Sequence, residues 1–177
     1  MPLIEYGHLD FGENKVQEAI DKWSDIKLNF PKIKLHLIGK LQTNKVKFAV
    51  KIFDYIHSVD SEKLAKKIAD EEIKINKKIK IFIQVNIGNE QQKSGINKSQ
   101  LQDFYLFCKK INLNIVGLMC IPPIDPDTIS FFKEMQTLTN DLKLNELSMG
   151  MSSDYIEAAR YSSTFLRIGS GIFGQRG

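Results

Sequence analysis

The chain has 177 residues, of which 42% are hydrophobic, 26% charged and 10% aromatic. This composition is typical of a globular domain, and the length favours a single domain with its own core. No apolar run approaches the roughly 18–20 residues of a membrane helix, which excludes a membrane-spanning protein. A complete (β/α)8 barrel usually needs about 200–250 residues, so the chain is also short for that fold.

The charge and the cysteine content indicate which macromolecular partners and metal sites to expect. The net charge is +4, and only three of the 25 basic residues are arginines, at Arg160, Arg167 and Arg176. The lysines alternate with acidic residues, which is typical of a solvated surface and predicts no nucleic-acid and no membrane partner. Cys108 and Cys120 lack metal-ligand spacing, which predicts packed, reduced thiols. Residues 1–7 lack the features of a signal peptide, which predicts a cytoplasmic protein.

Strand-like and helix-like segments alternate along the chain. Residues 1–7 resemble the last turn of a helix that ends at Gly7. Runs rich in β-branched and aromatic residues then predict seven strands, at residues 9–11, 34–38, 55–59, 80–87, 114–119, 146–148 and 164–168. Apolar residues at helical spacing predict six helices between them, covering residues 16–26, 43–51, 62–69, 101–111, 129–142 and 152–161. Repeated β-α units indicate a parallel sheet with helices outside, and functional groups at the carboxyl ends of the strands.

The segment after the last strand is rich in glycine. Residues 167–174 read Arg-Ile-Gly-Ser-Gly-Ile-Phe-Gly. Phosphate sites in barrels often lie in the loops after the last two strands, where glycines let backbone N–H groups converge on phosphate oxygens. Ser170 adds a hydroxyl. The segment therefore predicts a phosphate site, with a structural turn as the alternative.

The preceding strand ends in a second polar segment. Ser152 or Ser153 is a natural N-cap, and Asp154 falls in the first turn of the helix that follows. A helix N-terminus with free N–H groups binds anions, although a plain cap is an equal alternative. The two segments together predict one phosphate site.

Other polar residues carry weaker signals. Asn14 follows the first strand, where it either caps the next helix or points into the barrel mouth. His36 lies inside a strand, where a lone histidine is more often packed in the core than catalytic. His8, His36 and His57 lack metal-site spacing, and no Ser-His-Asp set or phosphate-binding Gly-x-x-x-x-Gly-Lys loop is present.

Several of these segments match a known family. Residues 11–19 resemble its Phe-Gly-Glu-Asn-x-Val-Gln-Glu signature, and residues 36–45 its His-x-Ile-Gly-x-Leu-Gln-x-Asn-Lys segment. Further matches follow in order, at residues 58–61, 84–87, 93–95, 117–119, 148–152 and 167–174. The chain resembles the pyridoxal phosphate homeostasis protein family, also called the YggS-like or proline synthetase co-transcribed family.

The resemblance implies a fold and a function. The fold would be a TIM-type (β/α) barrel of the alanine racemase N-terminal-domain type, forming one domain over residues 1–177. The function would be to bind pyridoxal 5′-phosphate (PLP) in PLP homeostasis, without catalytic turnover. By this resemblance Arg167 faces the pyridine nitrogen. Gly169, Ser170, Met151 and Ser152 hold the phosphate, and Asn14 and His36 line the ring side.

The chain departs from the family pattern at its start. The family's Schiff-base lysine lies in an Ala-Val-Ser-Lys-like segment ahead of Phe-Gly-Glu-Asn, and aligning on Phe11 places it before Met1. We therefore expect a barrel without its first strand, with seven strands, and PLP binding without a covalent link. Lys15 begins a helix and is not its equivalent, whereas Lys40 and Lys93 lie in βα loops.

Other interpretations stay open at this point. One is a mis-started or degraded fragment of such a protein. The others are a PLP-dependent racemase-like enzyme and an RNA- or partner-binding module that uses its lysine surface. The racemase-like enzyme would need a second domain, for which 177 residues leave no room. Ser162 also stands where the family usually has Gly, which we expect to disfavour a positive-φ turn there by about 1 kcal/mol.

Overall fold

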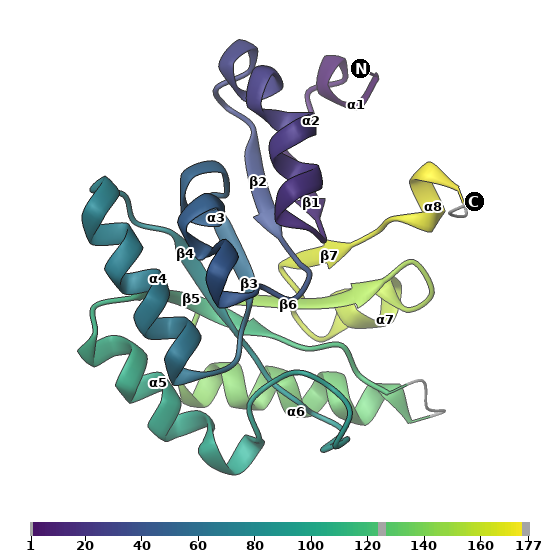
Figure 1. Cartoon of the computed structure of the whole chain (residues 1–177). Helices are drawn as coiled ribbons and strands as arrows, with labels where there is room; N and C mark the ends of the chain where they lie inside the picture. The colour runs from purple at the N-terminus through teal and green to yellow at the C-terminus, as the bar shows by residue number, and fades with distance from the viewer. Residues whose placement is uncertain (1, 124–126, 175–177) are drawn as a thin grey trace.

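The computed structural model describes residues 2–123 and 127–174. Its seven parallel strands follow one another around a nearly closed barrel in the order of the chain (Figure 1). They are β1 (Asp10–Glu13), β2 (Lys34–Leu37), β3 (Tyr55–Val59), β4 (Lys80–Gln84), β5 (Asn114–Met119), β6 (Glu146–Met151) and β7 (Phe165–Arg167). Within the described residues β1 and β7 are the two edges of the sheet. The predicted seven-stranded barrel is confirmed.

Helices alternate with the strands and surround the outside of the barrel (Figure 1). They are α1 (Pro2–Glu5), α2 (Val16–Asn29), α3 (Val46–Ile52), α4 (Glu62–Ile75), α5 (Leu101–Lys110), α6 (Thr128–Asp141), α7 (Tyr155–Arg160) and α8 (Ser170–Phe173), with 3-10 turns η1 (Thr43–Lys45) before α3 and η2 (Lys98–Gln100) before α5. Gly7 follows α1 with φ +94°, as the helix-end prediction requires. In the part of the chain described, no helix has the length and apolar character to cross a membrane.

The core explains why the central strands read as continuous apolar runs. Ile81, Phe82 and Ile83 in β4 are all fully buried, because side chains on one face fill the barrel and those on the other pack under the helices. Cys108 and Cys120 are free and buried, as predicted, and burial raises the pKa of each thiol to about 12.

Two glycines allow close backbone approaches in this barrel. A Cβ on Gly117 in β5 would overlap the carbonyl group of Glu146 in β6, so the two strands meet at the glycine. A Cβ on Gly39 would overlap the carbonyl of Asn14. The loop after β2 therefore lies directly against the loop after β1, at the carboxyl edge of the barrel.

Three local predictions are corrected or refined. The strand predicted at residues 146–148 continues to Met151, so the helix predicted from Ser152 begins only at Tyr155, with Asp154 in the N-cap position. Neither Ser152 nor Ser153 caps it. Ser162 does adopt φ +64°, so the turn for which the family uses glycine is present here with a serine.

Candidate functional site

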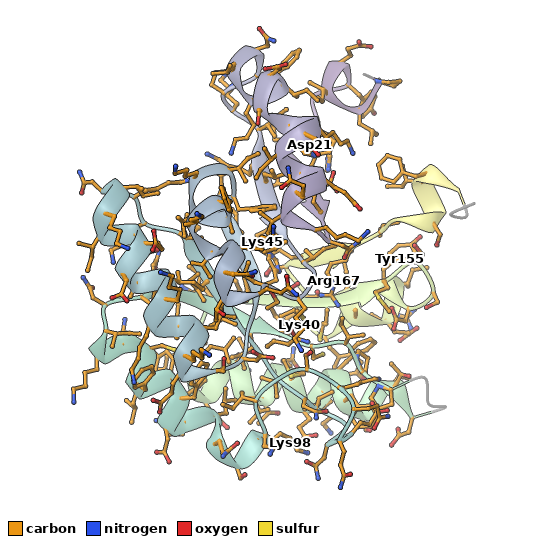
Figure 2. All side chains as sticks on the ribbon, in the orientation of Figure 1. Asp21, Lys40, Lys45, Lys98, Tyr155 and Arg167 are labelled. Carbon is orange, nitrogen blue, oxygen red and sulfur yellow. The ribbon has the colours of Figure 1, made fainter. Side chains whose placement is uncertain are left out.

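Arg167, labelled in Figure 2, is the last residue of β7 and donates to two acceptors, one in β6 and one directly after β5. Its Nη1 donates to the hydroxyl of Ser148 at 2.8 Å, and its Nη2 donates to the carbonyl of Cys120 at 2.8 Å. Burial lowers the pKa of Arg167 from its usual value, yet a guanidinium stays charged at any physiological pH. The contacts fix a planar cation between the end of β7, the middle of β6 and the residue after β5.

The ends of β6 and β7 meet at the hydroxyl of Ser152. Its Oγ accepts the backbone N–H groups of Gly169 and Gly171, both at 3.2 Å. Two backbone N–H groups that converge on one oxygen form a nest, the arrangement that proteins use for anions. A Cβ on Gly169 would meet no atom within 4 Å, so there is open space beside the Cα of this residue. The structure thus brings the two predicted segments together.

The remaining residues of the predicted phosphate site lie around this nest. The N–H of Met151 donates to the Asp154 carboxylate at 2.6 Å, so this amide is already occupied. Ser170 begins α8 with an exposed hydroxyl. Binding of phosphate by these residues stays a prediction, with Ser170 better placed than Met151 to add a donor.

His36 lies in the barrel interior and is only 3% exposed. Its Nε2 contacts Asp10 Oδ1 at 3.0 Å, its Nδ1 contacts Nε2 of His57 at 3.0 Å, and its ring stacks on Tyr55. Both ring nitrogens therefore have protein partners, which agrees with the packed-core interpretation. The predicted contact of His36 with the cofactor ring stays untested.

Asn14, Lys40 and Lys93 occupy loops at the carboxyl edge. Asn14 is exposed and does not cap α2, whose N-cap is Lys15. Lys40 is exposed in the loop after β2 (Figure 2). Lys93 is engaged, because its Nζ lies 2.6 Å from the Glu90 carboxylate and 3.3 Å from a backbone carbonyl. Of the two lysines, Lys40 is the more accessible amine.

Two residues of the site escape sequence reasoning. Ser148 links Arg167 to the interior, and His57 contacts the same hydroxyl through Nδ1 at 2.9 Å. His57 is 1% exposed and stacks on Phe82. The sequence signal for Ser148 and Arg167 is the alternation of side chains between the two faces of a strand, which places both at inward-facing positions. This alternation does not reveal that the two side chains touch.

Acid is expected to destabilise the fold through the two interior histidines. Burial is the main cause that lowers the pKa of His36, and burial, then His36 and Arg167, lower that of His57. In the unfolded chain both titrate near pH 6.5. As the pH falls below about 6.5 the unfolded state takes up protons that the folded state does not, so the free energy of unfolding falls by up to about 1.4 kcal/mol per pH unit for each histidine. The loss ends below the folded pKa values.

Urea unfolding between pH 5 and 8 measures this effect. The variant His57→Gln is expected to flatten the pH dependence, while the control His8→Gln, at an exposed position, is expected to leave it unchanged. An unfolding free energy of the wild-type chain that does not change over this range would contradict the prediction.

Comparison with known proteins shows to which family the chain belongs. A family model described as alanine racemase, N-terminal domain, matches residues 1–177. The pyridoxal phosphate homeostasis protein of Vibrio cholerae serotype O1 is 36% identical over 99% of this chain and 79% of that protein, and the one from Escherichia coli K12 is 33% identical over 98% and 78%. The chain belongs to the pyridoxal phosphate homeostasis protein family. The resemblance predicted from the motifs is confirmed.

Solved structures agree with this family. PipY of Synechococcus elongatus PCC7942, solved with PLP bound, has a TM-score of 0.89 and 34% identity, over 98% of this chain and 85% of that one. The alanine racemase of Clostridium difficile 630 has a TM-score of 0.76 at 14% identity, over 98% of this chain and 47% of that one, and so shares the fold. The Vibrio cholerae and Escherichia coli relatives are named as homeostasis proteins, whereas a racemase appears among the distant fold relatives.

Proposed function

We propose that the chain binds PLP at the carboxyl ends of β6 and β7 and serves PLP homeostasis without turning over a substrate. One observation carries the proposal: the pair of N–H groups that meets Ser152 begins at Gly169, two residues along the chain from Arg167, a cation fixed in place. The PLP-bound structure of PipY, which covers 98% of this chain, supports the choice of ligand.

The nest suits the phosphate end of this ligand. The Ser152 oxygen now takes the place between the Gly169 and Gly171 N–H groups that a phosphate oxygen would occupy. When the Ser152 side chain turns aside, both N–H groups and its own hydroxyl become available to the phosphate. Ser170 adds a second hydroxyl on the same loop. Backbone N–H groups and hydroxyls are the donors that hold phosphates in other proteins.

Arg167 suits the ring end and supports the absence of turnover. Bound PLP supplies an aldehyde and an electron-withdrawing ring, and the ring withdraws best when its nitrogen is protonated. A guanidinium can only donate, so it keeps a facing nitrogen unprotonated. The contacts of Arg167 with Ser148 and Cys120 hold this donor in place. We expect the chain to carry PLP in a weakly activated form.

Direct binding measurements test the proposal. Titration of the purified chain with PLP, followed by absorption and equilibrium dialysis, is expected to show saturable binding that inorganic phosphate competes away. Borohydride treatment and peptide mapping are expected to find no modified lysine. Failure to bind PLP would overturn the proposal, and an adduct on Lys40 or Lys93 would overturn its non-covalent form.

Ser152→Ala is expected to weaken PLP binding by about tenfold, because the charged phosphate loses the hydrogen bond from the Ser152 hydroxyl. Freeing the two N–H groups offsets little of this loss, because they are exposed and water replaces the hydroxyl. Ser153→Ala is the matched control, since Ser153 is exposed and lies outside the nest, and its affinity should stay within about twofold. Equal effects of the two changes would place the phosphate elsewhere.

A further inference from the structure

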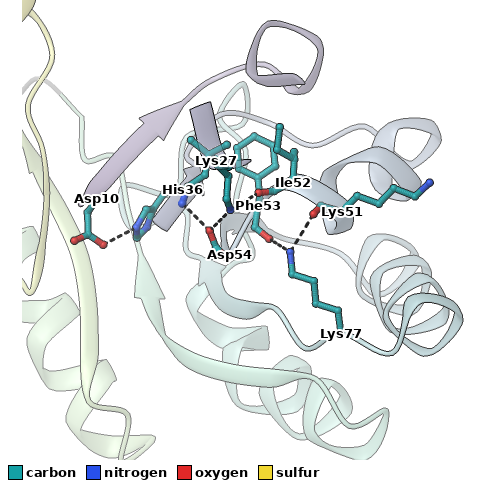
Figure 3. A network of polar contacts seen from close by, with 9 residues as sticks. Asp10, Lys27, His36, Lys51, Ile52, Phe53, Asp54 and Lys77 are labelled. Carbon is teal, nitrogen blue, oxygen red and sulfur yellow. Dashed lines mark hydrogen bonds and ion pairs between the residues drawn. The ribbon is translucent and has the colours of Figure 1, made fainter. Parts of the chain in front are cut away.

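A continuous hydrogen-bonded path crosses the barrel interior from β1 to β7. It starts at Asp10, at the first residue of β1, whose carboxylate reaches His36 in β2 (Figure 3). It passes to His57 in β3 and then to Ser148 in β6. It ends at Arg167 in β7. Every contact on the path measures between 2.8 and 3.0 Å.

With both histidines neutral, the Asp10 carboxylate fixes the direction of the hydrogen bonds, because it can only accept. At the other end Arg167 can only donate, so Ser148 Oγ accepts from it and keeps its own O–H to give to His57 Nδ1. His57 then carries its proton on Nε2 and donates to His36 Nδ1. His36 in turn carries its proton on Nε2 and donates to the Asp10 carboxylate. In this arrangement both histidines are neutral and share one tautomer.

With a neutral His36, the reverse direction is inconsistent with the Asp10 end. If His57 donated to Ser148 through Nδ1, its Nε2 would accept a proton from His36 Nδ1. The bare Nε2 of His36 would then face the Asp10 carboxylate, an acceptor against an acceptor. For two neutral histidines, the arrangement stated above is the one in which every contact has one donor and one acceptor.

Packing holds the path in place. His36 stacks on Tyr55 with ring centroids 4.2 Å apart, and His57 stacks on Phe82 at 4.2 Å. Phe165 contacts both histidine rings, with centroids at 5.3 and 5.7 Å. Neither imidazole can turn without displacing an aromatic neighbour, so the path is a fixed part of the core. Its far end is open to solvent, because the Asp10 side chain is 52% exposed.

We propose that Asp10, His36 and His57 form a relay that positions Ser148 and Arg167 and passes a change of protonation at the Asp10 end to the cofactor end. His36 and His57 are positioning residues in this relay. The part that concerns the cofactor rests on the proposed function, whereas the hydrogen-bond order is a property of the protein alone.

The relay responds to an added proton in a defined way. A proton added to His36 Nδ1 would face the N–H of His57, so His57 must move its proton to Nδ1 and donate to Ser148. Ser148 then accepts from both His57 and Arg167 and no longer gives its O–H to the relay. The charged groups that act on this path from neighbouring elements are Asp10, Asp54 and Lys27 around His36, Lys80 on the Tyr55 hydroxyl, and Arg167 beside His57.

Nitrogen NMR of the cofactor-free chain tests the hydrogen-bond order. With ¹⁵N-labelled histidine, two-bond proton–nitrogen correlations at pH 7.5 are expected to show His36 and His57 both neutral with the proton on Nε2. A proton on Nδ1 of either ring, or a charged ring, overturns the relay whether or not the chain binds PLP.

Two variants of His57 test the coupling to Arg167. In His57→Asn the amide oxygen can replace Nδ1 as acceptor for Ser148 but does not reach His36. We expect PLP affinity within about twofold of wild type, and loss of the change that acid causes in the absorption of PLP bound to the wild-type chain. In His57→Leu the acceptor is lost, and PLP affinity is expected to fall by about three- to tenfold.

A readout without PLP separates this inference from the proposed function. The guanidinium protons of Arg167 are expected to exchange with water faster in His57→Leu than in wild type and at the wild-type rate in His57→Asn. If both variants leave the exchange rate unchanged, His57 does not position Arg167. Circular dichroism of each variant checks that the barrel remains folded.

Discussion

Replacing Arg167 by methionine is expected to weaken PLP binding by about 10- to 100-fold, the largest loss that a single change at the site should cause. The substitution keeps an unbranched chain but removes a cation that the fold holds on Ser148 and Cys120. The ligand loses a charge-assisted contact, and the carbonyl of Cys120 loses its guanidinium donor. Equilibrium dialysis with PLP measures the loss.

Arg167→Lys separates charge from geometry. A lysine keeps the positive charge but offers a single ammonium in place of a planar fork, so it cannot reach Ser148 and Cys120 in the same way. We expect an intermediate affinity and a changed absorption of bound PLP, because the donor facing the ring is no longer fixed. An affinity equal to wild type in both variants would remove Arg167 from the site.

Gly117→Ala is expected to lower the free energy of unfolding by about 3 kcal/mol or more, or to prevent folding. The new methyl group would overlap the carbonyl of Glu146 and approach Phe82 in the barrel interior to 2.7 Å. The Glu146 carbonyl belongs to the neighbouring strand, so relief requires β5 and β6 to separate rather than a side chain to turn. Urea unfolding followed by circular dichroism measures the change.

Gly169→Ala is the matched control for folding. The same methyl group at Gly169 would meet no atom within 4 Å, and the backbone there has negative φ. Its free energy of unfolding is expected to stay within about 0.5 kcal/mol of wild type. A similar loss in both variants would mean that the general cost of replacing glycine, and not strand contact, governs Gly117.

The sequence is a good guide to the barrel because strand and helix patterns alternate with different periods. β3 and β5 appear with their predicted ends. The end of β6 is missed, because Met149, Gly150 and Met151 lack the β-branched residues that mark a strand. The four-residue helix α8 is also missed. Glycines flank it on both sides and a third lies within it, and glycine disfavours a helix.

The nest at Ser152 was predictable in part, and the interior path was not. Gly169 and Ser152 each carry a local signal, and the order of parallel strands places their loops side by side. The contact between His36 and His57 depends instead on the register of β2 and β3, in which His36 lies beside Tyr55. Register is set by packing across the whole sheet, which no local pattern encodes.

The hydroxyl of Ser152 has a consequence for how fast a ligand exchanges. Because it already bridges Gly169 and Gly171, the loop after β7 has its binding shape before any phosphate arrives. If phosphate binds there as proposed, its arrival and departure amount to the substitution of one oxygen for another, and neither step waits for a loop to fold or melt. Exchange of the ligand would then need only a local turn of the Ser152 side chain.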